Sequence, residues 1–504
     1  MFTKLNSAAV MGLDCVPIDV EVDINKGQTN FTIVGLADTS IKEAKDRIHS
    51  ALKNSGFSYP FNFRILVNLA PADINKEGPA YDLPMAVGIV VISNGLDINL
   101  DDTLIVGELA LDGGVRHVNG VLPLAIFAKE RGLRRLFVPA SDATEAALVE
   151  GSIVYPVQNL QQLMNHLLGV EEIKPFQQQI NWNESERSEY EMDMALIKGQ
   201  EFAKRALEIA ASGAHNILMS GPPGSGKTLL ARTLASILPK LSSEEALEVT
   251  KIYSVAGLLQ NNIIRTRPFR SPHHTASGAA LVGGGRIPRP GEISLAHKGV
   301  LFLDEFPEFP RLVVESLRQP LEDGVITVSR VQGTISFPAR FILVASQNPC
   351  PCGYSSDPDR KCVCSPIQIM RYQKKISGPI LDRIDLHVEV PRVEFEKLAG
   401  DGLAESSEKI RERVEAARET QRIRFQDKPV HTNSEMRNAE IREFCKLDEA
   451  SVDILKAAVT QMHLSARTYN RILKLARTIA DLGRSEDIKM EHVAEALQFR
   501  TKVE

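Results

Sequence analysis

Apolar side chains over the first 168 residues of the chain follow two different periods. Residues 18–22 and 31–34 are short runs of alternating or β-branched apolar residues, which is the pattern of half-buried strands. Residues 41–50 and 142–149 instead place apolar side chains three and four positions apart, which is typical of amphipathic helices. This mixture of periods predicts an α+β domain over residues 1–168.

A second block, residues 194–393, begins with a helix, a strand and another helix. Residues 200–212 are apolar at helical spacing, residues 216–220 form a short apolar run, and helical spacing returns at residues 228–237 after a glycine-rich turn. Further apolar runs are short and continuous, as in strands that are buried on both faces of a parallel sheet. We therefore expect this block to be an α/β core.

Strand-like runs vanish from about residue 394, and the last block, residues 394–504, is helical in pattern. Each segment repeats its apolar residues with a period near 3.6, and short polar stretches separate the segments. This pattern predicts a small helical bundle. The segments with helical spacing are residues 406–425, 435–445, 451–462, 467–482 and 490–499.

Residues 169–193 connect the first two blocks and carry few apolar side chains. From Glu171 to Asp193 there are seven acidic and two basic residues, a local net charge of −5. So polar a segment cannot bury enough apolar surface to form a core, and we expect a solvated linker. A chain of 504 residues suits the three domains that remain, because single cores stop growing at about 250 to 300 residues.

The overall charge of the chain does not point to a nucleic-acid partner, because 59 basic and 64 acidic residues give a net charge of −5. The apolar stretches at residues 8–13 and 83–92 are six and ten residues long, too short for a secretory signal or a transmembrane helix. The six cysteines do not form a disulfide framework. We expect a cytoplasmic protein with no membrane partner.

A glycine-rich turn in the second block fits the phosphate-loop pattern G-x-x-x-x-G-K-[ST]. It follows a buried strand and opens a helix, as the pattern requires. Its glycines let backbone N–H groups approach the phosphates of a nucleotide, Lys227 would reach the β- and γ-phosphates, and Thr228 would bind Mg²⁺. The nucleotide-binding residues are Gly221, Pro222, Pro223, Gly224, Ser225, Gly226, Lys227 and Thr228.

Two acidic residues follow the apolar run at residues 299–303. Asp304 and Glu305 fall at the carboxyl end of this expected strand, where parallel α/β sheets bind their ligands. Asp304 would complete the Mg²⁺ shell, and Glu305 would polarise the attacking water. Asn348 falls just past the next apolar run, residues 341–345, where it could orient that water; for an asparagine taken alone, a turn is the better interpretation.

Four of the six cysteines lie within fifteen residues, in the pattern C-x-C-x₉-C-x-C directly after Asn348. Four thiolates with turn-forming residues between the pairs suit a closed tetrahedral zinc site. One-residue spacing within each pair is less usual than two, so free thiols and redox chemistry stay open beside structural zinc. The candidate zinc ligands are Cys350, Cys352, Cys362 and Cys364.

A basic insertion, about residues 257–298, separates the phosphate loop from Asp304. Between Arg265 and Lys298 six basic residues oppose one acid, Glu292, for a net charge of +5. Repeated around a ring, such a segment would line a pore with positive charge for a phosphate backbone, although a solvated loop or a subunit contact is the alternative. A hairpin-like stretch, residues 326–341, is a second candidate for the segment that contacts DNA. The candidate DNA-contacting residues are Arg265, Arg267, Arg270, His273, His274, Arg286, Arg289, Arg330 and Arg340.

The order of phosphate loop, Asp-Glu strand, Asn348 and helical bundle resembles an AAA+ ATPase. Longer motifs narrow the resemblance to the magnesium-chelatase-like proteins, specifically the ComM (YifB) family, over essentially the whole chain. Members of that family look like hexameric ATP-driven DNA motors. The resemblance implies ATP and Mg²⁺ as cofactors, a ring of six subunits, and single-stranded or branched DNA and recombination proteins as partners. The motifs are PFRSPHH at residues 268–274, GGG at 283–285, PGEISLAHKG at 290–299 and LDRID at 381–385.

The resemblance also implies roles for single residues. Asn348 matches sensor 1, which orients water beside the γ-phosphate. Arg383 matches the arginine finger that enters the active site of a neighbouring subunit, and Arg467 matches sensor 2 of the helical lid; for either arginine alone, a surface salt bridge is the alternative. Residues 197–200 resemble the segment that cups the adenine.

Residues 1–168 resemble the protease-type domain of Lon, with the S5 domain 2-like fold. The stretch that carries the nucleophilic serine in that family has Ala80 here, and the stretch that carries the general-base lysine has Leu122. A serine–lysine dyad needs a hydroxyl and an amine within hydrogen-bond reach. We therefore expect a scaffold or a DNA-contacting domain without a catalytic dyad.

Three functions differ in how well they fit these features. The leading hypothesis is an ATP-driven DNA helicase or branch-migration factor, and the resemblance to the ComM (YifB) family implies that it acts in homologous recombination during natural transformation. The alternative is a magnesium-chelatase-type motor subunit that remodels a protein partner, but such a motor needs neither the Lon-like domain nor the basic insertion. A Lon-type peptidase is disfavoured by Ala80 and Leu122.

Overall fold

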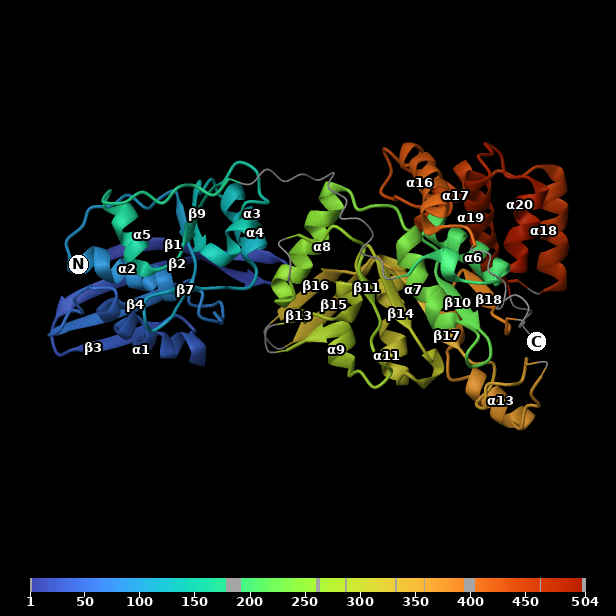
Figure 1. Ribbon diagram of the computed structural model, residues 1–504, viewed down its shortest axis with the longest axis horizontal. Helices are drawn as coiled ribbons and strands as arrows, with labels where there is room; N and C mark the ends of the chain where they lie inside the picture. Colours follow the sequence, from blue (N-terminus) through green and yellow to red (C-terminus); the bar gives the residue numbers. More distant parts are fainter. Residues whose placement is uncertain are drawn as a thin grey trace. The chain divides into compact units, whose positions relative to one another are not determined.

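A computed structural model of the chain divides it into two compact units (Figure 1). The first unit comprises residues 1–184, 243–264 and 287–289, and the second comprises the remainder. The sequence predicts three contiguous domains, so two short segments of the central block group differently from expectation, and the C-terminal helices share a unit with the α/β core. The structure describes residues 2–177, 192–259, 263–285, 288–330, 333–357, 359–393, 404–462 and 464–500.

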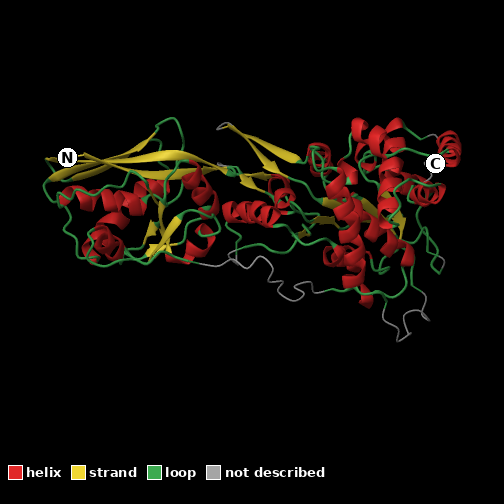
Figure 2. Ribbon diagram, turned by 90° about the horizontal axis from the view of Figure 1, so that it is seen from above, coloured by secondary structure: helices red, strands yellow, loops and turns green. Residues whose placement is uncertain are grey.

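Helices joined by turns make up the described part of the chain after residue 404, as predicted (Figure 2). The expected helix at residues 435–445 is divided into a short 3-10 turn, η4 (Asn433–Glu435), and helix α17. Among the described helices, none combines the length and the apolar character that crossing a membrane requires. The C-terminal helices are α16 (Ser407–Arg424), α17 (Asn438–Phe444), α18 (Glu449–Gln461), α19 (Ala466–Leu482) and α20 (Met490–Gln498).

The first unit is built on a seven-stranded mixed sheet in the order β3-β4-β2-β1-β5-β8-β9. Its central strands β1 (Phe2–Met11) and β2 (Asp14–Lys26) form an antiparallel hairpin, and β4 (Phe63–Ala70) also pairs antiparallel with β2, whereas the other neighbours are parallel. The predicted α+β class is thereby confirmed. The other strands are β3 (Asn30–Val34), β5 (Thr103–Ile105), β8 (Arg135–Pro139) and β9 (Ile153–Val157), with a small ribbon of β6 (Glu108–Leu109) and β7 (Val115–Arg116).

Helices cover both faces of this sheet. Because side chains alternate in direction along each strand, β5 and β8 contribute apolar residues to two separate clusters. Ile105 and Phe137 belong to one buried cluster, whereas Leu104 and Leu136 belong to another. The ten-residue apolar stretch at residues 83–92 lies in a helix that is buried all round, which explains why it shows no amphipathic period. The helices of the unit are α1 (Thr39–Asn54), α2 (Asp82–Ser93), α3 (Val121–Glu130), α4 (Ala143–Ala146), α5 (Leu160–Leu167) and α8 (Ser243–Ala256), of which α8 packs against α3.

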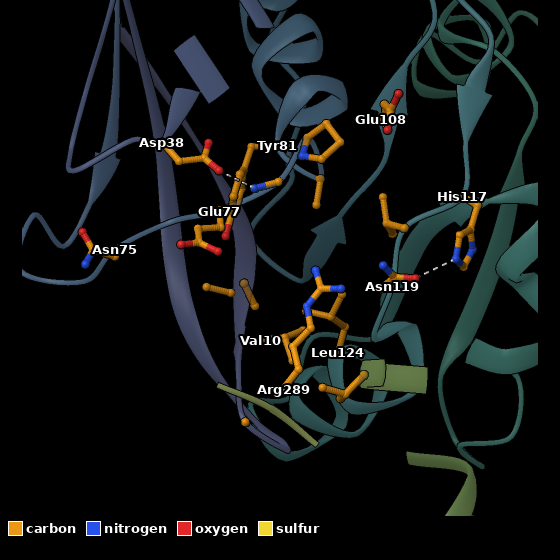
Figure 3. A pocket seen from close by; sticks show the side chains of 18 of the residues that line it. Val10, Asp38, Asn75, Glu77, Tyr81, Glu108, His117, Asn119, Leu124 and Arg289 are labelled. Atoms are coloured by element: carbon orange, nitrogen blue, oxygen red, sulfur yellow. Dashed lines mark hydrogen bonds between the residues drawn. The ribbon is translucent and has the colours of Figure 1, made fainter. Parts of the chain in front are cut away.

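A pocket of about 400 Å³ in the first unit lies where the resemblance to Lon places a catalytic centre (Figure 3). Ala80 lines it, and Leu122 is fully buried in the neighbouring apolar cluster. The polar side chains of the pocket include Glu77 and His117, and His117 is already bonded through Nδ1 to Asp142 at 2.6 Å. The described pocket therefore offers no serine–lysine dyad.

The second unit contains a five-stranded sheet in which all neighbouring strands are parallel. Its spatial order is β11-β14-β17-β10-β18. Strand β10, which comes first along the chain, therefore lies between β17 and β18, which come last. The carboxyl ends of all five strands lie at one edge, which is where such sheets bind ligands. The strands are β10 (Ile217–Ser220), β11 (Phe269–Arg270), β14 (Val300–Leu303), β17 (Ile342–Gln347) and β18 (Leu386–Glu389).

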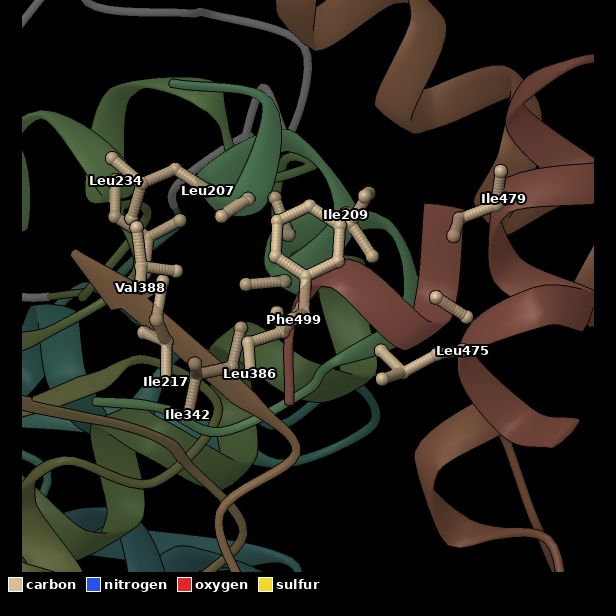
Figure 4. Close-up of a cluster of buried hydrophobic side chains, with 14 of the residues drawn as sticks. Leu207, Ile209, Ile217, Leu234, Ile342, Leu386, Val388, Leu475, Ile479 and Phe499 are labelled. Atoms are coloured by element: carbon tan, nitrogen blue, oxygen red, sulfur yellow. The ribbon is translucent and has the colours of Figure 1, made fainter. Parts of the chain in front are cut away.

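One hydrophobic core joins this sheet to the C-terminal helices (Figure 4). Helices α6 (Glu201–Gly213) and α7 (Lys227–Ile237) pack into it beside α19, which contributes Leu475 and Ile479. Phe499 is fully buried and stacks on Phe202 with ring centroids 4.8 Å apart. This shared core explains why the C-terminal helices do not form a separate unit.

The chain between residues 194 and 381 also contains several short elements. The expected hairpin is present as the antiparallel pair of β15 (Val325–Arg330) and β16 (Gly333–Pro338). The other short elements are η2 (Met194–Leu196), α9 (Gly278–Val282), β12 (Gly283–Gly284), β13 (Arg289–Pro290), α10 (Glu292–Leu295), η3 (Phe306–Glu308), α11 (Arg311–Ser316), α12 (Arg318–Asp323), α13 (Pro366–Gln373) and α14 (Gly378–Leu381).

Candidate active site

The predicted phosphate loop connects β10 to α7, in the strand–loop–helix context that its motif requires. Gly221 lies so close to β18 that an added Cβ would be 2.1 Å from the carbonyl oxygen of Val390, so no other residue fits there. Helix α7 begins at Lys227, and its first backbone N–H groups have no partner within the helix. These donors and the helix dipole favour an anion at the loop.

The lysine of the loop lies against the loop backbone and the residue that matches sensor 1. Lys227 Nζ donates to the carbonyl oxygens of Gly221 and Pro222 at 2.8 and 2.9 Å and lies 3.3 Å from Oδ1 of Asn348. Burial lowers the pKa of the Lys227 amine from its ordinary value. The fold thus brings together two predicted site residues that are 121 positions apart.

The two residues expected to bind Mg²⁺ are in direct contact. Thr228 Oγ1 donates to Oδ2 of Asp304 at 3.0 Å. Neighbouring oxygen ligands of octahedral Mg²⁺ are also about 3.0 Å apart, since each Mg–O distance is about 2.1 Å. Ser346 of β17 donates to the other carboxylate oxygen, Oδ1, and fixes its orientation. The type and the spacing of these oxygen atoms both suit Mg²⁺. The sequence does not predict the contact of Ser346 with Asp304, because a single serine at the end of an apolar run carries no distinct signal.

Glu305 follows Asp304 in an uncommon backbone conformation. Its φ angle is +52°, in the left-handed region that costs energy for a residue with a Cβ. Its backbone N–H donates to Asp304 Oδ1 at 3.0 Å and to Ser346 Oγ at 3.3 Å, which stabilises this conformation. The side chain is 54% exposed, and its Oε2 lies 3.3 Å from Nδ1 of His274. His274, predicted to contact DNA, is therefore a neighbour of the proposed base.

The segment expected to hold the adenine lies beside the phosphate loop. Gln200 donates from Nε2 to the carbonyl oxygens of Ser225 and Pro391 at 3.3 and 2.6 Å. Ile197 is 4% exposed and belongs to the core beneath the segment. The segment is thus fixed between the loop and the end of β18, as a nucleotide-binding segment needs to be.

The two arginines assigned by resemblance have different surroundings in the single chain. Arg383 is only 8% exposed, and its guanidinium donates to Glu322 and to the carbonyl oxygen of Pro379. Arg467 is exposed on the first turn of α19. Their predicted roles involve a neighbouring subunit and a bound nucleotide, and both stay predictions.

A half-buried asparagine links the segment of Arg383 to the central strands. Asn216 precedes β10 and donates from Nδ2 to the carbonyl oxygen of Arg383 at 3.1 Å. Its Oδ1 accepts from the backbone N–H of Leu343 in β17 at 2.9 Å. Sequence reasoning missed Asn216, because its partners lie more than a hundred positions away.

Asp385, two residues after Arg383, links the same segment to α19. It accepts from Arg471 at 3.0 Å and lies 3.2 Å from Nδ1 of His215. Although burial acts in the opposite direction, the charge of Arg471 and the hydrogen bond with His215 hold the pKa of Asp385 well below its usual range. Arg471 stands one helical turn after Arg467, so this ion pair connects the segment of Arg383 with α19, the helix that carries Arg467.

The basic insertion makes more internal contacts than its sequence suggests. Arg270 forms two hydrogen bonds of 2.6 Å with Glu292, and Arg267 donates to the carbonyl oxygen of Lys298 at 2.7 Å. These bonds connect the two arginines to other residues of the insertion, which the net charge of +5 does not indicate. A charge count does not reveal pairing, because the partners lie 22 and 31 positions away.

The remaining DNA candidates differ in exposure. Arg265 and His274 are half-buried, and Arg289 and His273 are exposed. Arg340 lies 3.7 Å from Glu435. Arg286 and the side chain of Arg330 fall outside what the structure describes. DNA contact therefore stays a prediction for all of these residues.

The four clustered cysteines converge after β17. The Sγ atoms of Cys350, Cys352 and Cys362 are 3.4 to 3.7 Å apart, and the Sγ of Cys364 also lies within 4.8 Å of each. In a tetrahedral site with Zn–S bonds of about 2.3 Å, the sulfur atoms are about 3.8 Å apart. Backbone N–H groups of Tyr354 and Val363 lower the pKa of Cys352 to about 6, which favours the thiolate. The donor set therefore fits zinc.

The cysteine segment also touches the phosphate loop. Gly353 has a φ of +86°, and an added Cβ would lie 2.6 Å from Cδ of Pro223. No other residue could bring the two segments this close. The cysteine segment therefore bears directly on the loop that binds the nucleotide.

Three family models of the magnesium chelatase ATPase subunit match the chain. "Subunit ChlI of Mg-chelatase" matches residues 20–142, "Magnesium chelatase, subunit ChlI" matches residues 193–398, and its C-terminal counterpart matches residues 404–500. These matches, the parallel sheet and the phosphate loop define an AAA+ ATPase of the magnesium-chelatase type, for which ATP and Mg²⁺ are the expected ligands.

Full-length relatives narrow this class further. The chain is 45% identical to competence protein ComM of Haemophilus influenzae, over 99% of this chain and 97% of that protein. It is 44% identical to the protein YifB of Escherichia coli, over 98% and 96%. The magnesium-chelatase 38 kDa subunit of Rhodobacter capsulatus is 32% identical over only 31% of this chain and 49% of that protein. The chain belongs to the ComM/YifB family.

Proposed function

We propose that this protein is an ATP-driven DNA motor that works as a ring, migrates DNA branches and acts in recombination during natural transformation. The observation that carries the enzymatic part is the convergence of Lys227, Thr228, Asp304 and Glu305 at one edge of the sheet. The relative named as a competence protein supports the biological context, because it resembles this chain from end to end.

The residues at this edge have separable parts in hydrolysis. Lys227 and the free N–H groups of α7 bind the β- and γ-phosphates, and Thr228 and Asp304 hold Mg²⁺, which neutralises charge on the phosphate oxygens. Glu305 accepts a proton from the water that attacks the γ-phosphorus. Asn348, which lies beside Lys227, orients that water next to the γ-phosphate.

The arginine finger requires a rearrangement. In the single chain the guanidinium of Arg383 is bound to Glu322, so this bond must break before Arg383 reaches the γ-phosphate of a neighbouring subunit. Because Glu322 is 49% exposed, water can solvate it when the arginine leaves, and the exchange costs little. A ring thus completes an active site that a single subunit leaves incomplete.

Zinc bound by the four cysteines would hold the segment between Asn348 and Arg383 against the phosphate loop. We expect about one zinc per chain in purified protein, as measured by atomic emission. Cys362→Ser should lose the metal and weaken ATP binding, because Gly353 packs on Pro223. Cys15→Ser, a cysteine in the other unit, is the matched control and should keep the zinc. Metal-free wild-type protein with full ATP affinity would contradict the proposal.

The alternative function is a chelatase-type motor that remodels a protein. The descriptions of the matching family models favour it, whereas the partial match to the chelatase subunit itself does not. DNA discriminates between the two proposals. A DNA motor should hydrolyse ATP faster with single-stranded or branched DNA, and this stimulation should fall as salt rises, because phosphate contacts release counterions. A hydrolysis rate that DNA leaves unchanged would favour the chelatase-type motor.

A further inference from the structure

The loop after β11 brings a histidine to the proposed catalytic carboxylate. His274 Nδ1 lies 3.3 Å from Oε2 of Glu305. The neighbouring His273 instead turns its Nδ1 to Thr275 Oγ1 at 2.8 Å. The ring of His274 lies against that of His273, with centroids 4.1 Å apart, and meets Phe309 edge-on. These contacts restrict the orientation of the His274 ring.

The base of this loop is fixed to the strand that carries Glu305. Strand β11 pairs with β14 in parallel, with Arg270 opposite Leu301, and Glu305 follows the end of β14. Arg270 is bound twice to Glu292 at 2.6 Å, so the first residue before the loop cannot shift freely. The pairing of β11 with β14 and the bonds of Arg270 to Glu292 therefore hold the loop of His274 close to Glu305.

The chemistry of the pair defines its donor. A carboxylate oxygen only accepts hydrogen bonds, so across this distance of 3.3 Å the atom that can donate to Glu305 is Nδ1 of His274. One oxygen of Glu305, Oε2, is then occupied, and the other, Oε1, is left to accept a proton from water. Without such a bond, a carboxylate that is 54% exposed turns freely about its terminal torsion.

We propose that His274 is a positioning residue for Glu305: it holds Oε2 so that Oε1 faces the attacking water. The proposal rests on the proposed function, in which Glu305 is the general base. It assigns to His274 a part in hydrolysis, whereas its sequence context points only to DNA or a neighbouring subunit. The left-handed backbone of Glu305 directs Cβ, and His274 directs the carboxylate that Cβ carries.

The test is steady-state hydrolysis by the full chain without DNA. We expect His274→Ala to reduce kcat by about 10- to 100-fold, because small misplacements of a reacting group cost up to about 10² in rate, while KM changes by less than about twofold. His274→Asn should restore most of the rate, since its amide nitrogen takes the place of Nδ1. His274→Gln, whose amide nitrogen takes the place of Nε2, should not.

Controls separate positioning from folding and from the proposed function. His431→Ala removes an exposed histidine from the loop between α16 and η4 and should keep the wild-type kcat. A wild-type or higher kcat in His274→Ala overturns the inference, as does rescue by glutamine equal to that by asparagine. If Glu305→Gln retains turnover, the proposed function fails as well. If Glu305→Gln loses turnover and His274→Ala does not, only the positioning role proposed for His274 is wrong.

Discussion

Glu305→Gln is expected to lower the rate of ATP hydrolysis by about 10²- to 10⁴-fold, the usual contribution of a general base, and to leave nucleotide binding intact. Glutamine has the size of glutamate but cannot accept a proton from water at neutral pH. The groups that bind phosphate and Mg²⁺, including Lys227 and Asp304, do not depend on the Glu305 side chain. Single-turnover hydrolysis and titration with a fluorescent nucleotide measure the two effects separately.

The backbone around this substitution should not change. The N–H group of residue 305 makes its bonds to Asp304 and Ser346, and glutamine keeps that N–H group. Glu308→Gln is the matched control, because Glu308 lies one turn away on the surface and pairs with Lys375 at 2.9 Å. It should hydrolyse ATP at the wild-type rate. Full single-turnover hydrolysis by Glu305→Gln would remove Glu305 from its part in catalysis.

Arg383→Ala is expected to lower turnover by about 10³- to 10⁵-fold, the range found for arginine fingers, and to be rescued in part by a second inactive variant. Lys227→Ala lacks the phosphate contact but keeps Arg383, whereas Arg383→Ala keeps Lys227. In a mixed ring, some interfaces combine an intact loop with an intact finger. Hydrolysis measured against the mixing ratio should therefore pass through a maximum at which the mixture exceeds either variant alone.

The fold is expected to tolerate this substitution. Glu322, the partner of Arg383, is 49% exposed, so losing the arginine does not bury an unpaired charge. Arg371→Ala, an exposed arginine in α13, is the control and should retain the wild-type rate. Ring assembly of the mixture is checked by mass photometry. Mixed rings that assemble but hydrolyse no ATP at any ratio would show that Arg383 does not act across an interface.

Much of the fold is predictable from the periods of the apolar residues. The expected strand at 216–220 and helix at 228–237 are found within one residue at each end, as β10 and α7. Grouping into units is less predictable, because a period shows that a helix has a buried face without showing what covers it. Helix α8 lies within the central block of the sequence, yet Ser254 donates to Glu145 in the first unit at 2.5 Å.

The candidate site also contains residues that the sequence predicts and contacts that it does not. Lys227, Thr228 and Asp304 are predictable because their motifs are local and the carboxyl ends of parallel strands converge. The ion pair of Arg270 with Glu292 is not predictable from the sequence, since Glu292 lies 22 positions away, beyond an intervening loop. The approach of His274 to Glu305 spans 31 positions, and only the pairing of β11 with β14 brings the two together.

The central claim, that ATP hydrolysis moves DNA branches, is tested most directly by strand displacement on three- and four-way DNA junctions. The wild-type protein should convert labelled junctions into their separated products with ATP and Mg²⁺ and should leave them unchanged without ATP. Lys227→Ala should produce no conversion under the same conditions. Wild-type protein that hydrolyses ATP yet leaves both junctions intact, at low salt and in excess over DNA, would show that this ATPase does not move DNA branches.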